Sequence, residues 1–363
     1  MRRVLKTLGV LLGIVLVGLL VLLCWPFVNR SAPAARPAPM PIASNEDPAP
    51  LVSYIETSAL GIDAFVIHEN GTVVFTYGEA DVPMNMASTR KSVLSLLYGI
   101  AWDRGLIKLD RTLADLDIDE SETPLTELER QATIEQLLQA RSGVYIPAGA
   151  ESPEMKASRP KRGQYSPGTH HYYNNWDFNV LGTIFEKETG LRIGDALDMW
   201  LAQPLGMEDF NPSHVYFGQK EEVTDYPAYR MFMSARDLAR LGTLILQKGE
   251  WDDKRIVSEV WLTKSFTPSS RFEPMKWGFD NNAYGYSWWL NTENSAVVAE
   301  GWGGQFLYVD REHNMVFVAR RDTGNSGLGF QWFRQFKSVG FPDDLLEVRR
   351  LALEQRVSKP ITP

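Results

Sequence analysis

Ser88 and Lys91 are the residues best placed to do chemistry, because they stand three positions apart at the start of a predicted helix over 88–104. Apolar side chains recur at helical spacing through that stretch, and Gly105 ends it. Positions i and i+3 share a helix face. A serine hydroxyl needs a neighbouring base to become a nucleophile, and a desolvated lysine near other positive groups loses its proton more easily. The pair is therefore a candidate nucleophile and base, beside a helix N-terminus that favours an oxyanion.

Ordinary structural roles compete with this interpretation. Serine is a favoured N-cap residue, and lysine is common on exposed helix faces. A second Ser-x-x-Lys match occurs at Ser158 and Lys161. That match contains Pro160 and lies in a Pro- and Gly-rich stretch, so the i, i+3 geometry is not expected there.

Two further segments are candidates to complete a site. SPGTHHYYNNWDFNVLGTIFEKETG, residues 166–190, is a turn, a Tyr-Asn cluster and a predicted helix. A Tyr phenol there can relay protons and an Asn amide can hold a polar substrate atom, although such residues also anchor and cap helices. EGWGGQFLYVD, residues 300–310, is a glycine-rich entry into a strand, where a ligand can approach the backbone closely. By itself it is also an ordinary turn sequence.

The elements that must position these segments predict an α/β (α+β) fold. Asn70-Gly71 between two apolar runs predicts a hairpin. Residues 303–322 predict a second hairpin, and residues 284–290 a further strand. Helices are predicted over 133–140, 175–189, 235–248 and 258–264, the last two with Ser234 and Ser258 as N-caps. We expect an antiparallel sheet built from both ends of the chain, flanked by helices, with an inserted mainly helical region.

Taken in this order, from about residue 60 to about 335, these segments resemble the serine β-lactamase and penicillin-binding superfamily. Within it the chain is most similar to the class C-like esterases and the 6-aminohexanoate-dimer hydrolases. The resemblance implies a β-lactamase/transpeptidase-like fold and places the first motif on Ser88 and Lys91. The second motif, Tyr-x-Asn, has two registers here, Tyr172 with Asn174 or Tyr173 with Asn175. The family's spacing to the following Leu-Gly pair, residues 181–182, selects Tyr173 and Asn175.

The third motif departs from the family pattern. It falls on Trp302, Gly303 and Gly304, where the family usually carries Lys or His, a small residue and Gly. In relatives that recognise β-lactams, the cation and a hydroxyl bind a substrate carboxylate, and Trp and Gly cannot form such charge-assisted bonds. The resemblance therefore favours esters and uncharged linear amides. The long loop over 145–171 is an alternative source of a cation, through Lys156, Arg159, Lys161 and Arg162.

The reaction that the resemblance implies is acyl transfer to Ser88. Lys91, with Tyr173 bridging, takes the serine proton, and the backbone N–H groups of Ser88 and Gln305 hold the oxyanion. Asn175 and Trp302 would line the acyl pocket.

No cofactor and no metal are expected, since the adjacent His170 and His171 are poorly spaced to ligate one ion. A β-lactamase or D-Ala-D-Ala carboxypeptidase-like enzyme of the same fold remains an alternative. So does a membrane-tethered binding or sensor domain that does not turn over.

The N-terminus differs from the rest of the 363-residue chain, whose formal net charge of −8 and lack of basic runs make nucleic acid an unlikely partner. Residues 7–28 carry no charge and follow three basic side chains, which predicts a single-pass anchor in the inner (cytoplasmic) membrane with the hydrolase outside. Secretion after signal-peptide cleavage is the alternative. We expect an anchor or signal segment over 1–29, a Pro/Ala-rich linker over 30–50, a hydrolase domain over 51–345 and a tail over 346–363.

Overall fold

The computed structural model describes residues 49–57, 61–275, 279–323, 347, 348, 350 and 351. The predicted segment 1–29, most of the predicted linker 30–50 and most of the predicted tail 346–363 lie outside these ranges. None of the helices in the described ranges has the length and apolar character needed to cross a membrane. The predicted span, residues 7–28, is not among the described residues, so it stays a prediction.

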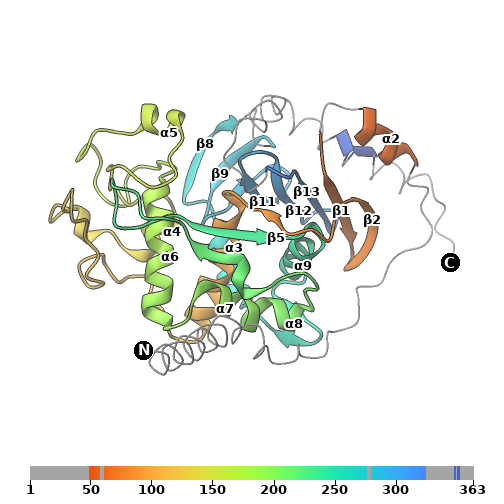
Figure 1. Ribbon diagram of the computed structural model, residues 1–363, viewed down its shortest axis with the longest axis horizontal. Helices are drawn as coiled ribbons and strands as arrows, with labels where there is room; N and C mark the ends of the chain where they lie inside the picture. The colour runs from red at the N-terminus through yellow and green to blue at the C-terminus, as the bar shows by residue number, and fades with distance from the viewer. Residues whose placement is uncertain (1–48, 58–60, 276–278, 324–346, 349, 352–363) are drawn as a thin grey trace, which may run out of the picture. The chain divides into compact units, whose positions relative to one another are not determined.

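An eight-stranded antiparallel sheet carries the fold, and it joins the two ends of the described chain (Figure 1). Strand β2 lies at one edge of the sheet and pairs with β1. Strand β1 pairs in turn with β13, the last strand of the described residues, along the whole length of both. In spatial order the strands are β2 (Thr72–Gly78), β1 (Ala64–Glu69), β13 (Met315–Arg320), β12 (Gln305–Asp310), β11 (Ala296–Gly301), β10 (Trp289–Asn291), β9 (Asn281–Tyr284) and β8 (Ser270–Met275). The predicted sheet built from both ends of the chain is confirmed.

Helices occupy most of the chain between the two ends, as predicted, together with two small sheets that were not predicted. The small sheets are β3 (Met84–Asn85), β5 (Tyr229–Met233) and β4 (Val215–Phe217), in that spatial order, and β6 (Glu250–Trp251) with β7 (Lys254–Arg255). The helices are α2 (Ala49–Thr57), α3 (Thr89–Asp103), α4 (Ile134–Leu138), α5 (Pro153–Ser158), α6 (Asn175–Thr189), α7 (Ile193–Leu197), α8 (Gln203–Leu205), α9 (Ala235–Leu246) and α10 (Glu259–Ser265). Short helical turns are η1 (Glu129–Gln131), η2 (Asp198–Ala202) and η3 (Pro212–His214).

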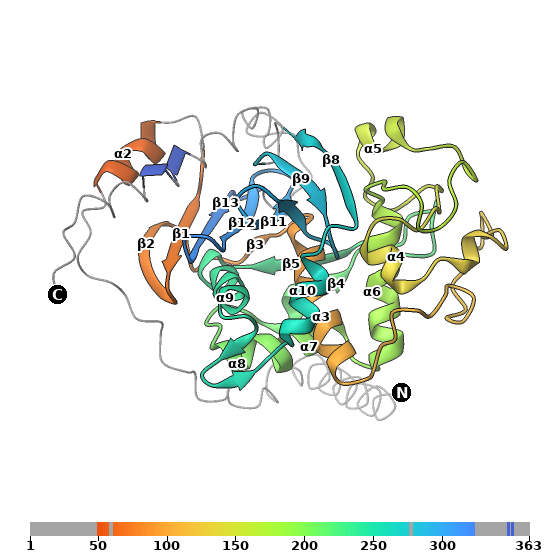
Figure 2. The ribbon, with the colours of Figure 1, turned by 180° about the vertical axis from the view of Figure 1, so that it is seen from behind.

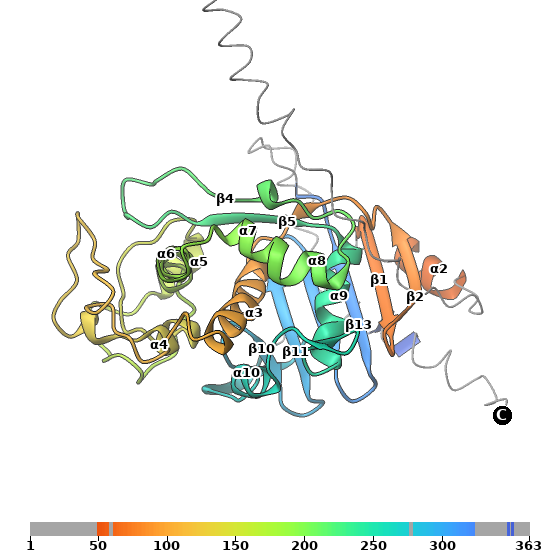
Figure 3. The same cartoon turned by 90° about the horizontal axis from the view of Figure 1, so that it is seen from below.

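Helix α3 is the central helix of the described chain. Residues 89–101 are all buried, so the helix is enclosed on every side rather than half exposed. It packs against β11 and β12 of the sheet, against α10, and against α6 and α7 (Figures 2 and 3). Helix α9 covers β1, β13 and β12. The start of α3 is therefore set between the large sheet and the helical region.

One predicted strand is wrong. Residues 284–290 do not form a single strand, because the chain turns between Tyr284, where β9 ends, and Trp289, where β10 begins. The Gly285 N–H donates to the Trp288 carbonyl, which closes the turn. Ser287 has a φ of 61° and donates its N–H to Leu138, so a helix of the inserted region holds the turn in place. The alternating aromatic pattern gave no sign of this long-range contact.

Candidate active site

Ser88 occupies the N-cap position of α3, but its side chain does not cap the helix. The structure gives its side chain no capping hydrogen bond, so the hydroxyl is available for other partners. The preceding residue, Ala87, has a φ of 46°, a left-handed conformation that costs a non-glycine residue about 1–3 kcal/mol. Two side chains hold it there: Asn85 Oδ1 accepts from the Ala87 N–H at 3.0 Å, and Arg90 Nη1 donates to the Ala87 carbonyl at 2.6 Å. The backbone is thus fixed immediately before the candidate nucleophile.

Lys91 is the hub of the site. Its side chain is buried, and Nζ lies 3.2 Å from Ser88 Oγ, 2.7 Å from the Tyr173 hydroxyl and 2.7 Å from Asn175 Oδ1. An ammonium group has three donors, and these three oxygens accept all of them. The Asn175 amide is itself oriented, because its Nδ2 donates to the Ala150 carbonyl at 2.7 Å. The structure therefore brings Ser88, Lys91, Tyr173 and Asn175 together.

The electrostatics of the group favour a neutral lysine. Burial lowers the pKa of Lys91 well below its usual value, the Arg90 charge lowers it further, and Asp177 opposes them. Burial raises the pKa of Tyr173 to about 12, against the hydrogen bond with Ser88 and the Arg90 charge. Lys91 is thus driven towards its basic form while Tyr173 keeps its proton at neutral pH. That is the pairing a base and a proton relay require.

The two registers of the Tyr-Asn cluster are separated by the structure. Tyr172 faces away from Lys91, and its hydroxyl donates to the Met155 carbonyl in α5 at 2.7 Å. Asn174 is the N-cap of α6: its Oδ1 accepts from the Trp176 N–H, and its Nδ2 donates to the Val144 carbonyl. The members of the other register, Tyr173 and Asn175, are the ones that contact Lys91.

The glycine-rich segment approaches the same helix start. Strand β11 ends at Gly301, where a β-carbon would lie 2.5 Å from the Met86 carbonyl oxygen, so only glycine allows this approach. The Thr89 hydroxyl donates to the Gln305 carbonyl at 3.1 Å, which brings β12 to the residue after Ser88. Gly303 and Gly304 have φ values of 81° and 88° and form the turn between the two strands. The role of Gln305 as second oxyanion donor stays a prediction.

Trp302 is the one predicted site residue whose side chain is exposed to solvent. It lies in the turn between β11 and β12, and 64% of its surface is exposed. An exposed indole offers apolar area that a ligand could contact. Its place in an acyl pocket stays a prediction.

Arg320, which sequence reasoning missed, ties together the strands that lead to the site. Its buried guanidinium donates to the carbonyls of Met84 and Met233 at 2.7 Å, to that of Asn85 at 3.2 Å, and to Gln305 Oε1 at 2.7 Å. The strand before Ser88 and the strand that starts at Gln305 are therefore fixed by one side chain. An arginine at the end of an apolar strand, in FVARRD, was the available signal.

Glu300, on β11, is a second residue that sequence reasoning missed. The residue is half-buried, and its Oε1 accepts from Nδ2 of the fully buried Asn281 at 2.8 Å. Burial raises the pKa of its carboxyl to about 8, and its charge adds to the raised pKa of Tyr173. An acid in such surroundings beside a candidate catalytic group is a candidate functional residue.

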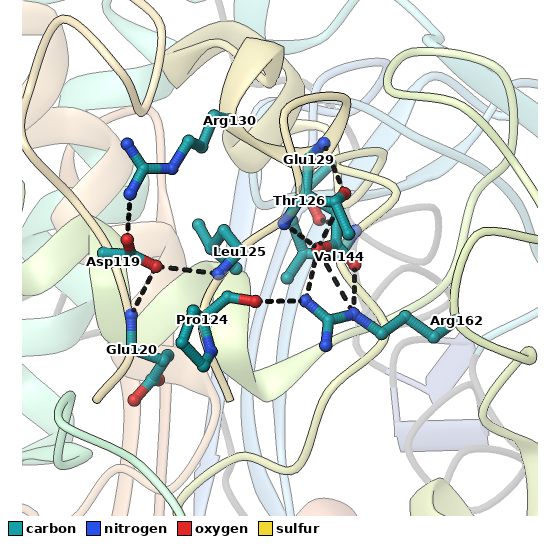
Figure 4. A network of polar contacts seen from close by, with 10 residues as sticks. Asp119, Glu120, Pro124, Leu125, Thr126, Glu129, Arg130, Val144 and Arg162 are labelled. Carbon is teal, nitrogen blue, oxygen red and sulfur yellow. Dashed lines mark hydrogen bonds and ion pairs between the residues drawn. The ribbon is translucent and has the colours of Figure 1, made fainter. Parts of the chain in front are cut away.

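The loop over 145–171 is fastened to its own surroundings. Arg162 forms a two-pronged ion pair with Glu129 and donates to the Pro124 carbonyl, and beside it Arg130 pairs with Asp119 (Figure 4). Arg159 is paired with Glu151. Two of the four basic side chains proposed as a substitute cation are therefore already engaged in ion pairs within the protein.

The two adjacent histidines take packing positions. His170 stacks on Tyr165 with ring centroids 3.9 Å apart. His171 packs between the rings of Phe272, Tyr284 and Trp289, and burial lowers its pKa to about 4. The second Ser-x-x-Lys match has no helical geometry: α5 ends at Ser158, whose hydroxyl donates to the Glu154 carbonyl.

Comparison with known proteins identifies the family. Residues 47–326 match the protein family described as Beta-lactamase. A 6-aminohexanoate-dimer hydrolase of Paenarthrobacter ureafaciens is 29% identical over 154 residues, which are 40% of this chain and 38% of that relative. The match thus spans well under half of the relative's length.

Solved structures share the fold. A penicillin-binding protein homolog from Caulobacter crescentus superposes with a TM-score of 0.57 at 18% identity, over 87% of this chain and all of that one. A family VIII carboxylesterase superposes with a TM-score of 0.55 at 15% identity, over 80% of this chain and 95% of the other. Since the family match runs from before α2 past the end of β13, it contains the whole sheet and every residue gathered around Lys91, and the chain belongs to the Beta-lactamase family of serine hydrolases.

Proposed function

We propose that the protein hydrolyses a small ester or linear amide through an acyl-enzyme on Ser88. The observation that carries the proposal is the contact of Lys91 Nζ with Ser88 Oγ, the Tyr173 hydroxyl and Asn175 Oδ1. Asn175 Oδ1 can only accept, so it takes one amine hydrogen whether Lys91 is charged or neutral. The neutral amine then has one hydrogen and one lone pair left, so it donates to one of the two hydroxyls, Ser88 or Tyr173, and accepts from the other.

Acylation follows from this arrangement. Ser88 Oγ attacks the substrate carbonyl carbon, and its proton passes to Lys91, directly or through Tyr173, whose oxygen is the closer to Nζ. The oxyanion forms beside the N-terminus of α3, where backbone N–H donors are each worth roughly 2.7–4 kcal/mol in the transition state. The leaving group departs with a proton from Tyr173, which Lys91 replaces. Water then attacks the ester of Ser88 by the reverse path, and the acid is released.

The relatives' names support an ester or amide as the substrate class. One curated relative is a 6-aminohexanoate-dimer hydrolase and one structural neighbour is a carboxylesterase. No Lys or Arg stands in the turn over 302–304 to hold a substrate carboxylate. This favours neutral or cationic substrates over β-lactams and D-Ala-D-Ala peptides.

We also propose that the enzyme is anchored by residues 7–28 with its hydrolase domain outside the cytoplasm. The full-length protein should fractionate with membranes, resist carbonate extraction and be cleaved by protease added from the outer side. Recovery of a soluble mature form that begins near Ala35 would support secretion instead.

A side-by-side assay of the full-length protein tests the function. The substrates are p-nitrophenyl butyrate, nitrocefin and a D-Ala-D-Ala peptide, and the readout is kcat/KM for each. We expect the butyrate ester to be the best substrate by about tenfold or more, because each missing charge-assisted hydrogen bond to a carboxylate is worth roughly 1.5–3 kcal/mol. Faster hydrolysis of nitrocefin would replace the proposal with a β-lactamase. An acyl-enzyme that forms and never hydrolyses would replace it with a sensor domain.

A further inference from the structure

Arg90 is a buried arginine that the proposed reaction does not use. It stands between Ser88 and Lys91 in the first turn of α3, and only 7% of its surface is exposed. Within the described part of the chain, no Asp or Glu forms an ion pair with it, and its Nε has no hydrogen-bond partner. A charge removed from water without a counter-ion is strongly destabilising, and a guanidinium does not lose its proton to avoid this. The unpaired charge therefore calls for an explanation.

Two uncharged groups hold the guanidinium in place. Nη1 donates to the Ala87 carbonyl at 2.6 Å, and Cζ lies 4.9 Å from the centroid of the Tyr229 ring on β5. Tyr229 is fully buried, and burial raises the pKa of its hydroxyl, so it stays protonated at neutral pH. A carbonyl and an aromatic ring attract a cation but do not cancel its charge.

The charge that remains acts on the next residue. Lys91 follows Arg90 directly, and both side chains are buried in the same turn of α3. Like charges repel much more strongly in a protein interior than in water, and the Arg90 charge lowers the pKa of Lys91 accordingly. Asp177 on α6 acts in the opposite direction and raises that pKa. Arg90 thus opposes the acid that would help Lys91 to keep its proton.

The same guanidinium also acts on the backbone before Ser88. Ala87 has a left-handed φ of 46°, and the hydrogen bond from Arg90 to its carbonyl is one of the two that hold it there. One side chain therefore reaches the base through its charge and the nucleophile through a hydrogen bond.

We propose that Arg90 is a positioning residue of the active site, whose uncompensated charge keeps Lys91 in its neutral, basic form. The inference rests on the proposed function, in which neutral Lys91 takes the proton of Ser88. It explains why the buried charge has no counter-ion, because a carboxylate paired with Arg90 would cancel its effect on Lys91. Arg90 acts through Lys91, so its removal should change the pH at which the enzyme works.

The test must separate the charge of Arg90 from its hydrogen bond. Ala87→Gly provides the background, since glycine adopts a positive φ without the cost of a side chain and depends less on the Arg90 bond. Arg90→Gln and Arg90→Lys are made in this background in the full-length protein, the first without the charge and the second with it. The readout is kcat/KM for p-nitrophenyl butyrate between about pH 5 and pH 9, followed where phenol and phenolate absorb equally, because this profile reports the pKa of the free enzyme's base.

The position of the acid limb is the expected difference. The Ala87→Gly parent and its Arg90→Lys variant should share one limb, whereas Arg90→Gln should move it up by about one pH unit or more. The rate should then fall about tenfold on the acidic side and recover as the pH rises. A purely structural role would instead lower the rate equally at every pH.

The other groups near the pair are the same in all these variants. The titratable and charged ones are Tyr173, Asp177 on α6, Tyr229 and Arg230 on β5, and Glu300 on β11. Burial raises the pKa of Tyr173 to about 12, so its titration lies outside the measured range. A shift between parent and variant therefore reports the Arg90 charge.

Arg104, at the other end of α3, is the matched control. Its Cζ also lies over an aromatic ring, 4.4 Å from the centroid of Trp200, but about 20 Å from Arg90 along the helix axis. Arg104→Gln should leave the acid limb in place. An equal shift in this variant would show that the net charge of the protein sets the limb, and it would overturn the inference.

The outcomes separate the inference from the function it rests on. Labelling of Ser88 by a fluorophosphonate measures the same limb without turnover, so the expected shift in labelling without ester hydrolysis overturns the proposed function and supports the inference. Ester hydrolysis with the same limb in Arg90→Gln and its parent overturns the inference alone. Neither hydrolysis nor labelling overturns both. If Arg90→Gln does not fold, Arg90→Met, which keeps the packing on the Tyr229 ring, takes its place with the same expected shift.

Discussion

Tyr172 and Tyr173 are adjacent, and each makes one hydrogen bond of 2.7 Å through its hydroxyl. Tyr172 donates to the Met155 carbonyl, whereas Tyr173 accepts from Lys91 Nζ. Replacement of either by Phe removes one hydroxyl and one such bond. The two variants are therefore matched in chemistry and differ only in where the hydroxyl points.

The expected magnitudes follow from these contacts. Loss of the Tyr172 bond should cost roughly 0.5–1.5 kcal/mol of unfolding free energy, the net worth of an ordinary hydrogen bond, and should leave kcat within about twofold. Loss of the Tyr173 hydroxyl leaves buried Lys91 with one acceptor fewer, at roughly 1–3 kcal/mol. It also removes the proton relay, which should lower kcat by about 10²- to 10⁴-fold, a barrier increase of roughly 3–5 kcal/mol.

Steady-state kinetics with p-nitrophenyl butyrate and urea denaturation of both variants measure these effects. The decisive comparison is between loss of rate and loss of stability, since only Tyr173→Phe should lose far more rate than stability. Equal rates for the two variants, or a slower Tyr172→Phe, would show that the hydroxyl bonded to Lys91 does not take part in the reaction. The assignment of Tyr173 to the proton path would then be wrong.

The remaining predictions concern the nucleophile, the base, the exposed tryptophan and the buried arginine that ties the strands together. Ser88→Ala should abolish turnover and labelling by a fluorophosphonate, while Ser158→Ala, at the end of exposed α5, should change neither; persistent labelling of the first variant would contradict the assignment. Lys91→Ala should lower kcat by about 10²- to 10⁴-fold or more, measured with the same ester. Trp302→Ala should slow the hydrolysis of bulky acyl esters more than that of acetate, because the exposed indole offers apolar contact area. Arg320→Met should cost roughly 3–5 kcal/mol in urea denaturation, since three buried acceptors and one partly buried acceptor lose their donor; a loss below about 1 kcal/mol would contradict the structural role given to it.

Much of the fold could be predicted because its signals are local. Asn70 and Gly71 have φ values of 48° and 79°, as the hairpin turn they predict requires. The helix predicted over 175–189 has those bounds, and Ser234 and Ser258 accept the backbone bonds expected of N-caps. The resemblance to the β-lactamase and penicillin-binding superfamily is confirmed by the family match.

The parts that could not be predicted depend on contacts between distant residues. Strands β4, β5 and β8 have no periodicity that separates them from loops. The left-handed conformation of Ala87 is held by Asn85 and Arg90, whose types alone indicate nothing of the kind. At the site, helical spacing was sufficient to pair Ser88 with Lys91, but Glu300 lies at the end of β11, directly before the glycines of the turn, and belongs to no recognisable motif. Its bond to Asn281 and its effect on the pKa of Tyr173 depend on contacts between residues far apart in the sequence.

The pairing of β1 with β13 determines how late in synthesis the candidate active site can form. Ala64 lies opposite Arg320 in the sheet, and the Arg320 side chain is also the donor for the carbonyls of Met84 and Asn85 just before Ser88. A ribosome that has released 300 residues has delivered Ser88, Lys91 and Tyr173 but not this donor. Closure over such a sequence separation is slow and occurs late. Ser88, Lys91 and Tyr173 are therefore translated early. The nascent chain carries them without the strand contacts that hold the site together until β13 has been made.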